Sequence, residues 1–275
     1  MTAKPKVGDN YVLATGAAGA AQLALLDEVY GPDAARIMRA LGLPHGGHVV
    51  DLGCGTGNTA RWLACEVGAE GEVTGVDVSA DQLAVATEKT ATEGIRNLRF
   101  IEANVYDTGL PRDTFDLVHC RFVLCHLVRP MDAVREMAAL AKPGGLVIAS
   151  DIDVSGLASV PSIPAYERMR EMFRMRGQRR GTDPTIGPKL PRMFLEAGLV
   201  SPEIAIIHPI YLRGERKRLW EYTLFESSQF MIEYGVCDQA ELDRLAIELA
   251  AVAADETIAV AQAPMSIAWA RKAER

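Results

Sequence analysis

The sequence has few cysteines, and their distribution argues against two kinds of stabilised fold. Five occur in 275 residues, an odd number, mostly inside apolar segments and with no CxxC spacing. A disulfide framework needs cysteines in pairs, and a zinc site needs closely spaced ligands. We therefore expect neither disulfides nor a metal centre, and the free thiols fit the reducing environment of the cytoplasm.

Positive charge and long apolar runs are also scarce. Lys and Arg number 29 against 36 Asp and Glu, which gives a net charge of −7. An acidic chain is poorly equipped to hold nucleic acid or an anionic membrane through charge. The longest uncharged stretch, residues 10–26, is too short and too polar to cross a bilayer, and its apolar spacing predicts an amphipathic helix. Neither nucleic acid nor a membrane is an expected partner.

From residue 48 onward, short apolar runs alternate with helical stretches. We expect strands at 48–52, 72–78, 98–103, 115–121 and 146–150, and helices at 59–67, 81–93 and 131–141. This alternation is typical of βαβ units, which build a parallel sheet with helices on both faces. Ahead of it, Gly31-Pro32-Asp33 predicts a break between two N-terminal helices.

After Asp151 the pattern is less regular. Residues 152–191 contain five prolines, and six arginines occur between 168 and 180. Further elements are expected as a helix at 189–197, a strand at 203–210, an Ala-rich helix at 239–260 and a strand at 265–270. The late strands would complete the sheet, and the inserted segments are candidates to cover a pocket.

A strand that runs into a glycine-rich turn and then a helix is the most informative motif. It reads Val49-Val50-Asp51-Leu52-Gly53-Cys54-Gly55-Thr56-Gly57. Such a turn lets a ligand approach the backbone and the free amides of the helix start, and it serves both dinucleotides and S-adenosylmethionine (SAM). The order G-x-G-x-G differs from the dinucleotide order G-x-G-x-x-G. Asp51 would repel a pyrophosphate but attract an ammonium or sulfonium group, which favours SAM.

Polar residues follow the next two predicted strands at the same edge of the sheet. Asp77 can accept hydrogen bonds from ribose hydroxyls, as either cofactor would require. Asn104 and the backbone after it could bracket an adenine ring. Gln82 forms a capping box with Ser79, which leaves capping and cofactor contact both open for its side chain.

These motifs resemble, in order and spacing, those of class I SAM-dependent methyltransferases. The resemblance covers residues 49–151: the glycine string, Asp77, the segment Phe115-Asp116-Leu117-Val118 and the segment Leu140-Ala141-Lys142-Pro143-Gly144-Gly145. Tyr11-Val12-Leu13 and Arg121-Phe122-Val123-Leu124 are similar to a small-molecule subgroup that includes ubiquinone, menaquinone and natural-product methyltransferases.

The resemblance implies an α/β fold: a Rossmann-like, seven-stranded, mostly parallel sheet whose last strand is antiparallel. We expect a single domain over residues 1–275. Within it, residues 1–46 would form a helical lid, 47–151 the SAM-binding core, and 152–192 and 211–262 insertions that cover the substrate. A homodimer is compatible with this organisation.

The resemblance also implies the cofactor contacts. SAM, with S-adenosylhomocysteine (SAH) as product, would be held by Tyr11, Asp51, Gly53, Cys54, Gly55, Asp77, Val78, Gln82, Asn104, Val105 and Arg121. Gln22 stands where many relatives carry arginine, so Arg121 is the better basic candidate for a carboxylate. Cys54 and Cys125 can also be small apolar filler near the site.

Catalytic candidates follow the fourth and fifth strands. His126 is a candidate general base, and Asp151 could take a proton or position His126, although Asp151 and Asp153 could equally cap the next segment. His119 is expected to be a core histidine bonded to backbone. The arginines of residues 168–180 either form a solvated helix face or, with Lys189 or Arg192, hold an anionic substrate group.

The expected activity is methyl transfer from SAM to an O, N or C atom of a small molecule, aromatic or isoprenoid in character. An alternative is a reaction such as cyclisation, with SAM or SAH kept as a structural part. A modifier of tRNA or protein is disfavoured by the charge of −7, and a nicotinamide dehydrogenase by the glycine order and Asp51.

Overall fold

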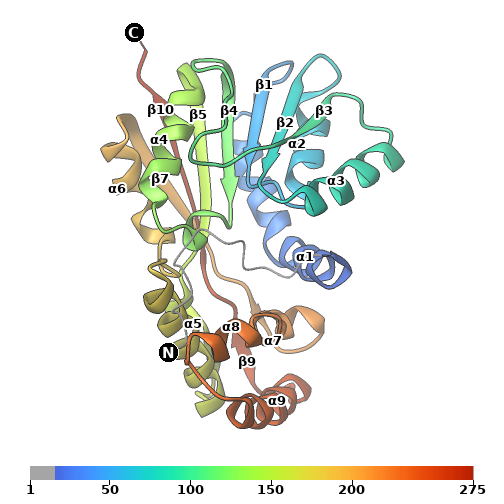
Figure 1. Cartoon of the computed structure of the whole chain (residues 1–275), viewed down its shortest axis with the longest axis vertical. Coiled ribbons are helices and arrows are strands. Elements are labelled where there is room, and N and C mark those ends of the chain that lie inside the picture. Colours follow the sequence, from blue (N-terminus) through green and yellow to red (C-terminus); the bar gives the residue numbers. More distant parts are fainter. Residues whose placement is uncertain (1–15, 275) are drawn as a thin grey trace, which may run out of the picture.

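The computed structural model describes residues 16–274, with side chains from residue 22 onward. In this part of the chain the main sheet has seven strands in the order β3-β2-β1-β4-β5-β10-β7. Their bounds are β1 (His48–Leu52), β2 (Glu72–Asp77), β3 (Leu98–Glu102), β4 (Phe115–Arg121), β5 (Ala141–Ile152), β7 (Leu199–Ile207) and β10 (Met265–Lys272). Strands β1 to β5 are parallel to one another, and β10 is antiparallel to both β5 and β7 (Figure 1). The predicted Rossmann-like sheet with an antiparallel last strand is confirmed.

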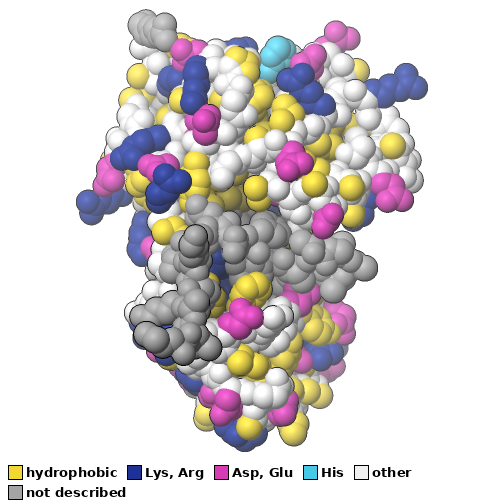
Figure 2. Space-filling view, in the orientation of Figure 1, with side chains coloured by type: hydrophobic (Ala, Val, Ile, Leu, Met, Phe, Trp, Pro, Cys, Tyr) yellow, Lys and Arg dark blue, Asp and Glu magenta, His cyan; other side chains and the backbone are white. Residues whose placement is uncertain are grey.

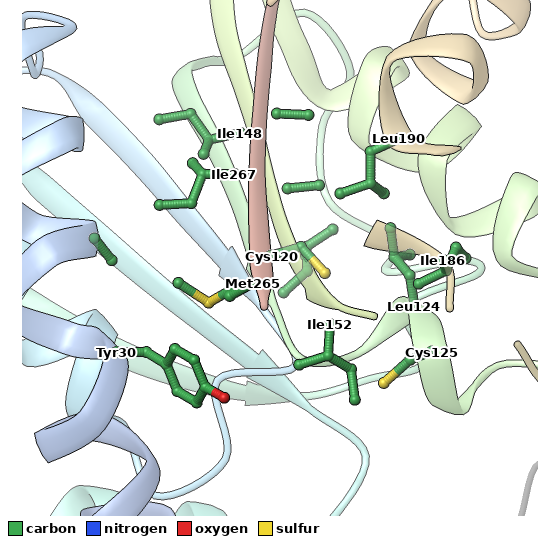
Figure 3. Packing of buried hydrophobic residues seen from close by; sticks show 14 of the residues in the cluster. Tyr30, Cys120, Leu124, Cys125, Ile148, Ile152, Ile186, Leu190, Met265 and Ile267 are labelled. Carbon is green, nitrogen blue, oxygen red and sulfur yellow. The ribbon is translucent and has the colours of Figure 1, made fainter. Parts of the chain in front are cut away.

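Helices cover both faces of this sheet. Helix α2 (Asn58–Val67) packs on β1 to β3 and contacts α1 (Gly16–Ala40), and α3 (Ala80–Thr92) packs on β2 and β3. On the other face, α4 (Pro130–Leu140) lies against β4 and β5, and α6 (Leu190–Glu196) against β7 and β10. Between the layers, Ile148 of β5 and Ile267 of β10 pack with other buried apolar side chains (Figure 3). The core therefore holds the carboxyl ends of the strands rigidly in place.

The predicted break at Pro32 is wrong, because α1 continues through it as one helix. Pro32 lies on the exposed side, where its missing N–H and its ring are tolerated. On the other side, Tyr30 and Met38 are buried in the core, and the Tyr30 hydroxyl donates to the carbonyl of Ala263 at 2.7 Å. Packing of that continuous face outweighs the local cost of the proline.

The inserted segments form a second layer next to the carboxyl ends of the main sheet (Figure 1). It contains α5 (Pro164–Arg180), α7 (Leu219–Glu226), α8 (Ser228–Glu233), α9 (Gln239–Ala254) and a small sheet β6-β9-β8, made of β6 (Ala158–Val160), β8 (Ile210–Tyr211) and β9 (Ala259–Ala261). This small sheet was not predicted from the sequence, because its strands are only two or three residues long and pair across distant parts of the chain.

The expected helix 239–260 ends earlier, at Ala254. The Asp255 side chain accepts from the Thr257 amide, and the Nζ of buried Lys217 donates to the carbonyls of Val252 and Asp255. These bonds satisfy backbone groups at the end of the helix, and the residues of β9 that follow form their hydrogen bonds within the small sheet.

The remaining differences are at strand boundaries. Strand β5 begins at Ala141, and the expected turn at residues 142–145 is an irregularity within its pairing to β4. The expected strand 203–210 is divided between β7 and β8. Among the described residues, no helix is long and apolar enough to span a membrane.

Candidate functional site

A pocket lies between the carboxyl ends of the parallel strands and the second layer. On the sheet side it is lined by residues at or just after the ends of β1 to β4, including Asp51, Gly53, Cys54, Gly55, Asp77, Val78, Asn104, Val105, Arg121 and His126. On the other side it is lined by residues of α1, α5 and α7, including Gln22, Arg176, Arg180, Trp220 and Glu226. The topology therefore brings the predicted cofactor edge and the inserted segments to one cavity.

Asp51 is buried near the end of β1 and is paired with a histidine. Its Oδ1 accepts from the Nδ1 of His119 at 2.7 Å, while its Oδ2 and the Nε2 of His119 have no hydrogen-bond partner. His119 is the neighbour of Asp51 in the β1–β4 register, so both side chains point to the same face. The expected backbone bond of His119 is wrong, because its Nδ1 bonds the aligned carboxylate of Asp51 instead. The remaining oxygen of Asp51 is a buried acceptor in the pocket wall.

The glycine turn is shaped so that the backbone lines the pocket closely. Gly53 has φ of +69°, and a Cβ placed on it would lie 2.2 Å from Cγ2 of Val123. Only glycine meets both conditions without strain. Cys54 also lines the pocket, and burial raises the pKa of its thiol well above the ordinary value, so it stays a neutral group.

Asp77 is the last residue of β2, and both of its carboxylate oxygens accept hydrogen bonds from backbone N–H groups. Oδ2 accepts from the Gly55 amide at 2.8 Å and Oδ1 from the Ser79 amide at 2.9 Å. Burial raises the pKa of this carboxyl, against the effect of those amides. Asp77 thus ties the glycine turn to the end of β2, and each oxygen keeps a second lone pair for a ligand. Val78, beside it, is 51% exposed in the pocket rim.

The remaining cofactor candidates differ in placement. Asn104 lines the pocket with Val105, and its Oδ1 accepts from the Tyr106 amide, which is the turn geometry common for asparagine. Gln82 is buried, and its backbone N–H donates to the Ser79 hydroxyl, as a helix cap requires. Its Oε1 occupies the space that a side chain on Gly55 would need, so the side chain of Gln82 packs directly against the glycine turn.

Two side chains of the pocket wall connect the N-terminal helix to other elements. The Arg121 guanidinium donates to Asp27 of α1 at 2.7 Å. Gln22 donates from its Nε2 to the Thr223 hydroxyl of α7 at 2.8 Å. Helix α1 is therefore fastened on both sides of the pocket. Tyr11 lies outside the described residues.

His126 lies in the single turn η1 (Leu124–His126) after β4 and lines the pocket. Burial lowers the pKa of its imidazole to about 3, and the positive charges of Arg176 and Arg180 act in the same direction. At neutral pH the ring is therefore uncharged. It can accept a proton or a hydrogen bond, but the lowered pKa makes it a weak base.

Asp151 is fully buried and is not part of the pocket wall. Its oxygens accept from the amides of Cys125 and Ile152, at 3.0 and 2.9 Å, and burial raises the pKa of its carboxyl to about 6. This geometry fits the positioning alternative, since the carboxylate holds the turn that carries His126. Asp153 instead caps its own turn, accepting from the amide and hydroxyl of Ser155.

The sequence did not single out the residues of the second layer that reach the pocket. Of the basic residues considered, Arg174, Lys189 and Arg192 pair elsewhere, with Glu171, Asp183 and Glu196. Arg176 and Arg180 line the pocket instead. A signal was available: Arg170 and Arg174 each have a glutamate three residues earlier, whereas Arg176 has Phe173 there. Glu226 of α7 also lines the wall, and burial raises the pKa of its carboxyl.

Comparison with known proteins agrees with this geometry. Residues 50–149 match the model of a methyltransferase domain family. A demethylmenaquinone methyltransferase of Staphylococcus aureus strain MRSA252 is 31% identical over 138 residues, which are 50% of this chain and 54% of the relative. The chain thus matches about half the length of that relative.

Solved structures share the fold at low identity. The YcgJ protein from Bacillus subtilis superposes with a TM-score of 0.60 at 17% identity, covering 88% of this chain and 98% of that one. Phosphoethanolamine N-methyltransferase 2 from Haemonchus contortus, in complex with phosphomonomethylethanolamine and SAH, gives 0.55 at 18% identity, covering 93% of this chain and 53% of that one. Residues 50–149 of this chain are thus similar in sequence to a methyltransferase domain, and the fold around them agrees with that similarity.

Proposed function

We propose that the protein transfers a methyl group from SAM to a small molecule bound in the same pocket. The observation that carries this proposal is the continuity of the cavity. It extends from the glycine turn and Asp77, on the cofactor edge, to His126 and the residues of α5 and α7. Two ligands can therefore meet inside it, as a group transfer requires.

The residues of the cofactor edge fit SAM. The partnerless Oδ2 of Asp51 is a buried anionic acceptor suited to an ammonium group, and the glycine turn leaves room for a ligand against the backbone. The free lone pairs of Asp77 suit ribose hydroxyls, and Asn104 with Val105 forms the wall for adenine. When bound, SAM supplies a methyl group on a sulfonium centre that is already activated for transfer.

The protein's own task is then to align the acceptor and to exclude water. Helix α1, fastened to α7 by the Gln22–Thr223 bond, forms one wall, and residues 1–46 act as a lid in this proposal. Residues 152–192 and 211–262 would cover the acceptor. His126, neutral at working pH, accepts a hydrogen bond from the nucleophile, and Asp151 keeps its turn in place.

A small acceptor of aromatic or isoprenoid character agrees with the apolar side chains in the wall. These include Leu26, Phe122, Leu127, Ile152 and Val154. The relative in Staphylococcus aureus bears the name demethylmenaquinone methyltransferase, which also supports a small-molecule acceptor. On the face shown in Figure 2, basic and acidic side chains of the described residues are interspersed, which does not favour a polyanionic partner.

Calorimetric titration with SAH and with NAD tests the cofactor. We expect SAH to bind and NAD not to compete, and the opposite result would contradict the proposal. Incubation with methyl-labelled SAM and candidate small molecules then tests the reaction. Conversion of a substrate without consumption of SAM would instead support the alternative of a cyclisation or similar reaction.

A further inference from the structure

We propose that Arg176 and Arg180 form a subsite for an anionic oxygen group, a carboxylate or a phosphate, of the acceptor molecule. The inference rests on the proposed function, because it concerns the acceptor side of the same pocket. It identifies the acceptor by charge, which neither the family nor the fold does.

The two arginines lie one turn apart on α5. Their i, i+4 spacing puts both on one face of the helix, and both line the pocket. Arg180 is only 5% exposed. The guanidinium carbon of Arg176 lies 5.2 Å from the centroid of the Phe173 ring, within the range of a cation–π contact.

The other arginines of α5 show what is unusual about Arg176. Arg168, Arg170 and Arg174 each form an ion pair with a glutamate. Arg176 has neither an ion pair nor a hydrogen bond with any residue that the structure describes. Arg176 is half-buried, a cation partly withdrawn from water without a partner is costly, and an anionic ligand would offset that cost.

The electrostatics of the neighbouring groups agree with two cations held close together. Burial and then the charge of Arg180 lower the pKa of Arg176 to about 10. Both arginines also lower the pKa of His126, the candidate group beside the acceptor. A guanidinium pair of this kind is suited to a planar or tetrahedral anion through paired N–H donors.

The position of the pair separates it from the cofactor edge. Asp51, Asp77 and Asn104 belong to the strand ends, whereas Arg176 and Arg180 come from the second layer. SAM has a carboxylate of its own, so the rival interpretation is that these arginines hold the cofactor. The experiment must therefore measure the affinities of cofactor and anion separately.

The test uses the full chain saturated with SAH, titrated with 4-hydroxybenzoate, with the neutral 4-hydroxybenzamide and with inorganic phosphate. We expect 4-hydroxybenzoate to bind at least about tenfold more tightly than the amide, since bonds between charged groups contribute this much or more. Arg176→Leu should remove that preference and leave the Kd of SAH unchanged. Arg174→Leu, on the exposed and ion-paired side of the same helix, is the matched control and should change neither.

The outcomes are distinct. The inference is overturned if the wild type binds neither anion, if Arg176→Leu keeps the preference, or if the SAH affinity falls with that of the anion. Phosphate binding without 4-hydroxybenzoate binding would support a phosphorylated acceptor. If Arg176→Leu fails to fold, Arg176→Gln gives the same comparison. Failure of SAH to bind the wild type would count against the proposed function, and the anion titrations can then be repeated without it.

Discussion

The unpartnered oxygen of Asp51 leads to the sharpest prediction. Asp51→Asn keeps the size of the side chain and an oxygen that can accept from Nδ1 of His119, now bonded at 2.7 Å. It replaces the buried Oδ2, which has no partner, with an amide donor. A cofactor ammonium would then meet a donor in place of an anionic acceptor.

The magnitude follows from the strength of a charged hydrogen bond. Such a bond contributes about 1.5–3 kcal/mol, which corresponds to a roughly 10- to 150-fold weaker Kd for SAH. With SAH at about 100 times the wild-type Kd, ligand binding stabilises the wild type by about 2.7 kcal/mol. A tenfold weaker variant retains only about 1.4 kcal/mol under the same conditions.

Titration calorimetry and denaturant unfolding with and without SAH measure both quantities. Without SAH the variant should be no less stable than the wild type, because a neutral amide is cheaper to bury than a carboxylate with one oxygen lacking a partner. Asp116→Asn is the matched control, since Asp116 lies at the opposite end of the sheet and bonds Lys142 and the His48 amide. An unchanged Kd in a folded Asp51→Asn protein would refute the assignment of this oxygen to the cofactor amine.

Three further predictions concern the turn, the histidine and the helix contact. Gly53→Ala should destabilise the protein and abolish SAH binding, because the new Cβ would collide with Val123. The double variant Gly53→Ala/Val123→Ala, which shortens the colliding side chain, should recover part of the stability measured by denaturant unfolding. No recovery would argue against the collision. His126 has a folded-state pKa of about 3 against an ordinary 6.5, so its contribution to stability is complete above about pH 6.5 and lost as pH falls towards 3. Between pH 7.5 and 5 the wild type should therefore lose on the order of 2 kcal/mol more than His126→Gln, and parallel profiles would contradict this. Gln22→Leu and Thr223→Val should each destabilise, with a coupling of about 1 kcal/mol in a double-mutant cycle, whereas additive effects would mean the bond contributes nothing.

The parallel core was predictable because its signals are local. Strand β1 and the strand at 115–121 occupy the expected residues, and the capping serine at 79 starts α3 as predicted. Each depends on the apolar period, on a cap or on glycine within a few residues. The break at Pro32 was wrong because packing of a continuous apolar face outweighed that local signal.

The small sheet and the acceptor side of the pocket depend on contacts between distant segments. Strand β9 pairs with strands about 50 and 100 residues earlier, and no pattern within a two- or three-residue strand predicts such partners.

What the sequence determined by itself is the edge where we propose that the cofactor binds: glycines for the turn, and Asp51, Asp77 and Asn104 at successive strand ends. Parallel strands necessarily bring their carboxyl ends to one edge, so spacing along the chain was enough. Only the tertiary structure decided how the charges are distributed among partners. In the folded protein, His119 bonds Asp51, and Asp151 is buried behind the pocket wall. Arg176 lines the pocket, whereas Arg174 on the same helix pairs with a glutamate. Charges interact through space, and which groups come within a few ångströms of each other is set by packing across the whole fold.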